Sequence, residues 1–218
     1  MKAPFRDRTH AGRELAKMLA EFRGTAALVL AIPAGGVPVA AAIATELGLP
    51  LDVAPVSKVL YPWTTESGYG AVAFDGSVWL DESRMSGHGV SAAQVERAVA
   101  AARAKVERRL ARLRSGRPRL ALEGRTVIAV DDGIAGGSTM RAAITALRRA
   151  GAAAVVLAVP TAHKSALATL SKLADAAYCA DVRGGASFAV AEAYREWRDL
   201  GDEEVEAALR NQGQAPVS

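Results

Sequence analysis

Residues 127–140 read Val-Ile-Ala-Val-Asp-Asp-Gly-Ile-Ala-Gly-Gly-Ser-Thr-Met, an apolar strand that ends in two carboxylates and continues into a glycine-rich turn. A helical stretch at 140–150 follows at once. Free backbone N–H groups and the positive end of the helix dipole make such a turn a site for an anion, most often a phosphate. Asp131 and Asp132 suit sugar hydroxyls or a metal ion beside that phosphate. The segment therefore indicates a phosphorylated sugar as its ligand.

Two other phosphate motifs fit this stretch poorly. A Walker loop needs a lysine before its Ser/Thr, and Gly137 occupies that place. A dinucleotide fingerprint places G-x-G-x-x-G directly after the strand, without paired aspartates. The plain alternative is a strand end followed by an ordinary turn. A lone Asp-Asp-Gly would favour that alternative, whereas the full succession of strand, acid pair, glycines, hydroxyls and helix favours a binding site.

The stretch resembles the signature for 5-phosphoribosyl-1-pyrophosphate (PRPP) in type I phosphoribosyltransferases. Residues 31–40, Ala-Ile-Pro-Ala-Gly-Gly-Val-Pro-Val-Ala, resemble the pyrophosphate-binding loop of a bacterial subgroup described only as predicted phosphoribosyltransferases. Shorter similarities to that subgroup lie at 5–8, 11–16, 70–73 and 188–190. The resemblance spans nearly the whole chain. It implies an α/β fold with a doubly wound, mainly parallel sheet, a flexible hairpin lid at about 58–90 and a small hood.

The resemblance also implies a role for each loop. The catalytic residues would be Asp131, Asp132 and Lys58. The two aspartates would hold the ribose hydroxyls and, through water, a magnesium ion. The 5-phosphate would be bound by Ile134, Ala135, Gly136, Gly137, Ser138 and Thr139. The pyrophosphate would be bound by Ala34, Gly35, Gly36 and Lys58.

Three positions depart from the subgroup's pattern. Ala34 stands where the subgroup usually has an arginine, and Ser57 replaces the arginine of its usual Arg-Lys pair. Gly136 replaces a threonine, whose hydroxyl Ser138 could supply instead. Two missing cations weaken a grip on pyrophosphate, because a charge-assisted hydrogen bond typically contributes about 1.5–3 kcal/mol.

No motif selects the acceptor of the phosphoribosyl group. Some purine enzymes of the family carry an acidic base at the position of Ala135, and this chain lacks that base. If the acceptor must lose a proton, Glu66 in the lid is the candidate base. Residues 61–63 and 181–188 would bind the acceptor, although their aromatic side chains suit a core or an interface equally well. A non-catalytic regulator of the same fold, which binds PRPP or a nucleotide, is the alternative. Ala34 and Ser57 favour it, whereas the acid pair, Lys58 and the long lid favour the enzyme.

Length and composition agree with one domain over residues 1–218. Half of the residues are hydrophobic, and a single cysteine excludes an internal disulfide. Residues 1–10 are polar and charged, and no apolar run approaches the ~18–20 residues that span a membrane. We expect a cytoplasmic homodimer that has no membrane partner and acts on PRPP and a small-molecule acceptor. The tail at 211–218 should be disordered.

Charge is unevenly distributed along the chain. Residues 96–125 hold ten Arg/Lys and three Glu, while residues 192–206 hold seven acids and two Arg. A basic stretch can attract nucleic acid. These cations lie mostly on the polar side of one amphipathic helix, which is typical of a solvated face. We therefore do not expect nucleic acid as a partner.

Hydrophobic periodicity predicts strands that alternate with helices. The expected helices are 9–22, 37–47, 91–114, 138–150, 163–172 and a final helical region from Phe188 to Leu209. The expected strands are 26–32, 51–56, 126–130, 153–159 and 174–179, with a hairpin of 70–74 and 77–80 around Asp75-Gly76. This alternation predicts a parallel sheet covered on both faces, with ligands bound beyond the carboxyl ends of its strands.

Overall fold

The main sheet is parallel, and its strands alternate their side chains between two hydrophobic cores. The computed structural model describes residues 3–65, 67–116, 121–185 and 188–212. Leu28 and Leu30 point into one core, while Val29 and Ala31 point into the other. A strand buried on both faces needs this period of two. The strand order is β2 (Leu51–Val53), β1 (Leu28–Ala31), β6 (Thr126–Val130), β7 (Ala154–His163) and β8 (Ala176–Arg183).

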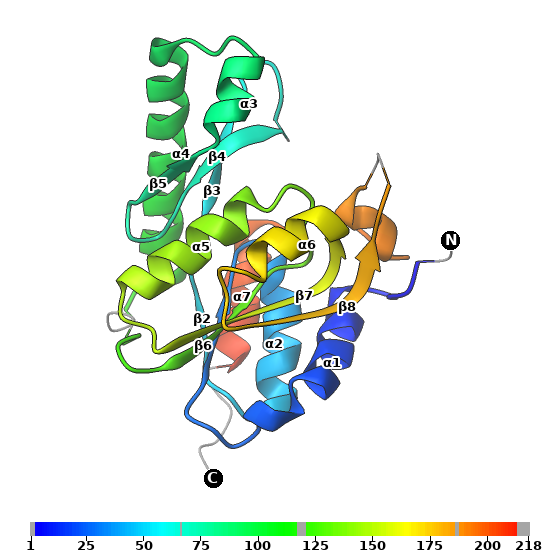
Figure 1. Ribbon diagram of the computed structural model, residues 1–218. Coiled ribbons are helices and arrows are strands. Elements are labelled where there is room, and N and C mark those ends of the chain that lie inside the picture. Colours follow the sequence, from blue (N-terminus) through cyan, green and yellow to red (C-terminus); the bar gives the residue numbers. More distant parts are fainter. Residues whose placement is uncertain (1–2, 66, 117–120, 186–187, 213–218) are drawn as a thin grey trace.

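Helices cover both faces of this sheet (Figure 1). On one face lie α1 (Arg8–Met18), α2 (Gly36–Leu47) and α7 (Asp202–Gln212). On the other lie α5 (Ser138–Arg149) and α6 (Lys164–Leu170). The doubly wound parallel architecture that the sequence predicts is confirmed.

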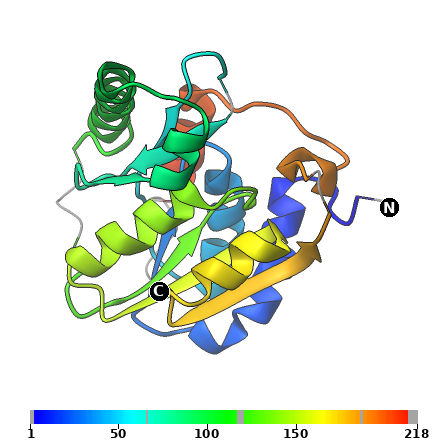
Figure 2. The same cartoon turned by 45° about the horizontal axis from the view of Figure 1, so that its top comes forward.

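A second, smaller unit stands beside the main sheet, next to α5 (Figures 1 and 2). We call it the hood unit. It consists of the antiparallel strands β3 (Ser57–Leu60), β4 (Gly68–Val72) and β5 (Val78–Leu80), with α3 (Glu82–Gly87) and α4 (Ala92–Leu113). The hairpin at Asp75-Gly76 and the Ser91 capping box of α4 form as predicted.

The predicted lid is more ordered than its glycine- and serine-rich sequence suggests. Val59, Tyr69 and Val72 of its sheet pack against Ala102 and Val106 of α4 and form a core of their own. The described residues of this segment, 58–65 and 67–90, are thus built into a folded unit. Whether that unit moves stays a prediction.

Several boundaries differ from the predicted ones. β7 and β8 run to His163 and Arg183, because Thr161 and Asp181 continue the ladder although they interrupt the apolar pattern. The predicted first helix ends at Met18, and a 3₁₀ turn, η1 (Ala20–Phe22), follows. Of the predicted tail, residues 211 and 212 belong to α7, and 213–218 lie outside the described residues.

The predicted final helix from Phe188 to Leu209 was wrong in its first half. Only η2 (Val190–Ala193) and α7 are helical in this stretch. Tyr194 is extended because the chain there pairs with the N-terminal segment. The Phe5 N–H donates to the Ala193 carbonyl over 3.0 Å, and the Arg195 N–H donates to the Phe5 carbonyl over 3.0 Å. A partner so distant in sequence leaves no local pattern.

The basic and acidic segments partly pair with each other. Arg109 Nη2 lies 3.3 Å from Asp202 Oδ1, and Arg112 of α4 forms an ion pair with Glu206 of α7. α4 therefore faces an acidic helix of its own chain. Among the described residues, no helix is both long enough and apolar enough to cross a membrane.

Gly12 allows α1 to approach α2 closely. A Cβ at this position would lie 2.4 Å from the Val39 carbonyl oxygen and 2.7 Å from the Ala42 Cβ. We predict that Gly12→Ala lowers the free energy of unfolding by about 1–3 kcal/mol in urea denaturation, because the overpacking outweighs the better helix propensity of alanine. The matched control is Gly87→Ala, whose Cβ would meet nothing within 4 Å. An equal loss in both variants would contradict this explanation.

Candidate functional site

The predicted site residues surround one cavity of about 970 Å³. β1 and β6 are neighbouring parallel strands, so the loops that follow them emerge side by side at the carboxyl edge of the sheet. The hood unit forms the opposite wall. Of the predicted residues, Asp131, Asp132, Lys58, Ala34, Gly35 and all of 134–139 line the cavity, whereas Gly36 does not.

The acid pair is held in a fixed arrangement at the end of β6. Asp131 Oδ1 accepts the N–H of Asp132 over 2.9 Å, and Asp132 Oδ2 accepts Arg8 Nε over 2.9 Å. Arg8 is itself oriented, since its guanidinium lies 3.9 Å from the centre of the Trp197 ring. The Tyr194 hydroxyl donates to the Asp132 carbonyl over 2.5 Å. The pair is therefore braced from the N-terminal helix and from the segment after β8.

The electrostatics of the pair favour a bound cation. Burial raises the pKa of Asp131 well above its usual range, and the charge of Asp132 raises it further, while Lys58 acts in the opposite direction. Burial also raises the pKa of Asp132, although Arg8 counteracts this. Two carboxylates that are costly to ionise together gain from a nearby positive charge.

Magnesium fits this donor set. Mg²⁺ is usually held by one or two carboxylates, with water and substrate phosphates completing the coordination. The described residues contain no group of three or more His, Cys, Asp or Glu that could hold a metal ion. Asp131 and Asp132 could therefore hold magnesium only together with oxygen atoms from water or from a ligand.

The loop after β1 lies directly against the acid pair. The Pro33–Ala34 peptide bond is cis. A Cβ on Gly35 would lie 1.9 Å from Asp132 Oδ2, and one on Gly36 would lie 2.7 Å from the Val130 carbonyl oxygen. The Gly36 N–H donates to the Ile32 carbonyl over 3.1 Å. Gly35 thus faces the cavity, while Gly36 serves the contact between α2 and β6.

The loop after β6 is fastened at one end and open at the other. The Ile134 N–H donates to the Thr161 carbonyl over 3.0 Å, and the His163 N–H donates to the Ile134 carbonyl over 2.8 Å. The Ile134 side chain is buried in the core. Gly137 caps α5 with φ +81°, and the first N–H groups of a helix have no acceptor within it. Ile134 therefore anchors the loop to β7, and residues 135–139 line the cavity.

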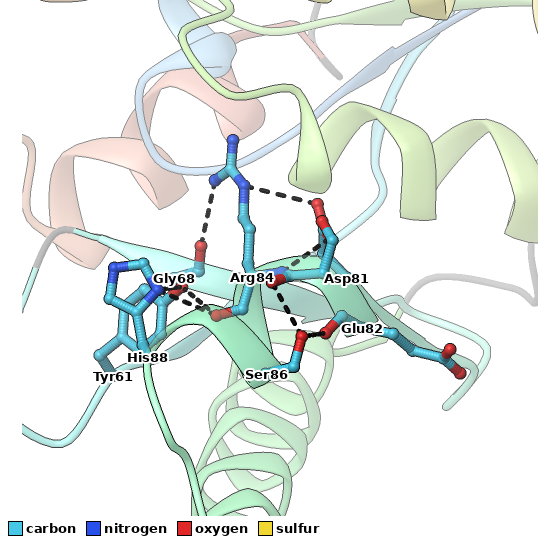
Figure 3. Close-up of polar contacts among 8 residues, drawn as sticks. Tyr61, Gly68, Asp81, Glu82, Arg84, Ser86 and His88 are labelled. Carbon is cyan, nitrogen blue, oxygen red and sulfur yellow. Dashed lines mark hydrogen bonds and ion pairs between the residues drawn. The ribbon is translucent and has the colours of Figure 1, made fainter.

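Sequence reasoning missed four cations that line the cavity, namely Arg8, Arg84, Lys105 and Arg109. Arg84 extends from α3 and contacts Gly68 and Asp81 (Figure 3). Lys105 and Arg109 are four residues apart on α4, a spacing that places them on one helix face. The spacing of these two residues is visible in the sequence. The contact of Arg109 with the loop at 33–35 could not be predicted, because α4 and this loop are distant in the chain.

Of the two segments expected to bind the acceptor, the first contributes to the cavity wall, whereas Asp181 of the second does not. Tyr61 lines the cavity, and Trp63 stacks on it at 5.1 Å between ring centroids while remaining 60% exposed. Asp181 instead accepts hydrogen bonds from Thr161 and Arg183, which tie it to the β7–β8 pair. Glu66 and residues 186–187 lie outside the described residues.

Comparison with known proteins identifies the family of the chain. A family model of the phosphoribosyl transferase domain matches residues 8–178. A Mycobacterium tuberculosis protein, named as a candidate phosphoribosyl transferase, is 40% identical over 205 residues, which cover 94% of this chain and 46% of that protein. This chain therefore spans about half the length of the curated relatives it matches.

A solved structure is similar over almost the whole chain. It is the crystal structure of TT1426 from Thermus thermophilus, with 37% identity and a TM-score of 0.77. The match covers 97% of this chain and 99% of that one. The chain belongs to the phosphoribosyl transferase domain family.

Proposed function

We propose that this protein transfers the 5-phosphoribosyl group of PRPP to an acceptor and releases pyrophosphate. The observation that carries the proposal is the meeting of three features around one cavity. An open helix N-terminus lies at Gly137, a half-buried acid pair lies at Asp131 and Asp132, and the glycine loop 33–35 lies in contact with that pair. Their order suits a 5-phosphate, a ribose and a pyrophosphate in succession.

Each part of the site has a proposed task. The backbone of 135–139, with the Ser138 and Thr139 hydroxyls, binds the 5-phosphate. Asp131 and Asp132 hold the ribose hydroxyls, and Arg8 keeps Asp132 in place through its 2.9 Å ion pair. Ala34, Gly35 and Lys58 contact the pyrophosphate. Binding energy from the two phosphate ends thereby fixes the position of the reacting carbon.

Magnesium belongs to the proposal as the partner of the acid pair. When bound there, it would neutralise charge on the leaving pyrophosphate. The chain's own contribution is to hold both carboxylates at the cavity and to exclude water. An oxocarbenium-like carbon reacts with water, so closure of residues 58–90 over the ligand would protect it. We also propose that the domain acts as a homodimer, which sedimentation equilibrium tests.

The acceptor is a small molecule whose identity the proposal leaves open. A nucleobase is one class, supported by the ring of Tyr61 in the cavity wall. A regulator that binds PRPP without catalysis is the second candidate, because Ala34 and Ser57 withhold two cations from the pyrophosphate end. Release of pyrophosphate with a nucleobase or another small-molecule acceptor identifies the enzyme, whereas PRPP binding without release across such a panel favours the regulator.

We predict that PRPP binding depends on magnesium and on the acid pair. The Asp131→Asn/Asp132→Asn double variant should bind PRPP at least about tenfold more weakly in isothermal titration calorimetry, since it loses the metal's carboxylates. Magnesium should strengthen binding to the wild type and not to the variant. Glu107→Gln, an exposed acid of α4 outside the cavity lining, is the control. Equal magnesium dependence in both proteins would refute the assignment.

We further predict that Asp131→Asn stabilises the free protein at neutral pH. The pKa of Asp131 is raised in the folded state, so its ionisation costs folding free energy as pH rises from the unfolded pKa through the folded one. The variant removes this cost, and its side-chain oxygen can still accept the Asp132 N–H. Its free energy of unfolding at pH 8 should exceed that of the wild type by about 1 kcal/mol.

The pH dependence provides the check on this prediction. The difference between Asp131→Asn and the wild type should disappear below about pH 4, where the carboxyl is protonated in both states. Urea unfolding between about pH 3 and pH 8 measures it. A variant that is less stable than the wild type at pH 8 would show that the ionised carboxylate stabilises the fold.

A further inference from the structure

The hood unit brings cations to the two ends of the cavity where the loops depart from the subgroup's pattern. Ala34 and Ser57 leave the pyrophosphate end short of positive charge, and Gly136 has no side chain where the subgroup's phosphate loop has a threonine. Lys105, Arg109 and Arg84 line the same cavity. They come from helices of the hood unit that lie opposite these loops.

Arg109 contacts the loop after β1, and Lys105 lies one turn away on the same face of α4 and lines the same cavity. Arg109 Nη1 donates to the Pro33 carbonyl over 3.0 Å, which fixes α4 against the residue that precedes Ala34. Arg109 Nε is buried and has no hydrogen-bond partner among the described residues. Partial desolvation lowers the pKa of Lys105, and the charges of Arg109, Arg108 and Lys58 lower it further, although Asp202 opposes them. Crowded cations of this kind favour a bound anion.

Arg84 faces the loop after β6. A Cβ on Gly136, where the threonine side chain of the subgroup would begin, would lie 3.5 Å from Arg84 Nη1 and 3.7 Å from Nη2. The guanidinium is positioned by Asp81 Oδ2 at 3.4 Å and the Gly68 carbonyl at 3.4 Å, both within the hood unit (Figure 3). Both contacts are long, so the guanidinium retains hydrogen-bonding capacity toward the loop.

We propose that the hood unit supplies two separate anion contacts, Lys105 and Arg109 for the pyrophosphate and Arg84 for the 5-phosphate. The inference rests on the proposed function and adds residues that the family signature does not contain. It also links ligand binding to closure of the hood unit over the cavity. Both phosphate ends of one ligand would be held between a loop of the main sheet and a helix of the hood unit, so ligand binding would stabilise their approach.

Two half-ligands separate the two contacts. Ribose 5-phosphate carries the 5-phosphate end, and magnesium pyrophosphate carries the other. We would measure the affinity of both for Lys105→Met and Arg84→Met by isothermal titration calorimetry. Lys105 is exposed and Arg84 is about half exposed, so neither variant should disturb the core. Arg103→Met, an exposed cation of α4 outside the cavity lining, is the matched control.

The expected result is a crossed pattern. Lys105→Met should weaken pyrophosphate binding about tenfold and leave ribose 5-phosphate unchanged, while Arg84→Met should do the reverse. Arg103→Met should bind both like the wild type. If the wild type binds both probes and neither variant changes either affinity, or each variant weakens both equally, the inference fails and the proposed function stands. If the wild type binds neither probe, the proposed function itself fails.

Discussion

The parallel pairing of β1 with β6 is the constraint on which the rest of the site depends. It places the ends of both strands side by side, so that the loop at 33–36 presses against Val130, Asp131 and Asp132. That contact is possible only because positions 35 and 36 lack a Cβ. The geometry of the proposed PRPP site thus follows from one strand register and two glycines. The hood unit then closes the cavity from the opposite side.

The same contact makes the free site electrostatically costly. Two adjacent carboxylates are partly withdrawn from water, and Arg8 and Lys58 offset only part of the cost. A protein selected for stability alone would not retain such a pair. A cation and a polyanion bound together would relieve the cost, because the cation neutralises the carboxylates and the surrounding N–H groups receive the phosphates. We therefore propose that the site binds magnesium and the sugar phosphate together, in preference to the metal or the phosphate alone.

Much of the main sheet and its loops could be predicted from the sequence, because their signals are local. The apolar strand, the acid pair and the glycines of 127–140 lie next to one another, and the capping box of α4 lies within four residues. The features that could not be predicted are contacts between distant segments. Arg8 reaches Asp132, Phe5 pairs with Ala193, and Arg109 reaches Pro33. The ends of β7 and β8 could not be predicted either, because the polar residues Thr161 and Asp181 interrupt the apolar pattern of the two strands.

A crystal structure of the protein with magnesium and PRPP tests the central claim most directly. We expect the 5-phosphate on the backbone of 135–139, magnesium between the acid pair and the ligand oxygens, and the pyrophosphate between 33–35 and Lys105. PRPP bound in the opposite direction, or outside the cavity between the main sheet and the hood unit, would contradict the account.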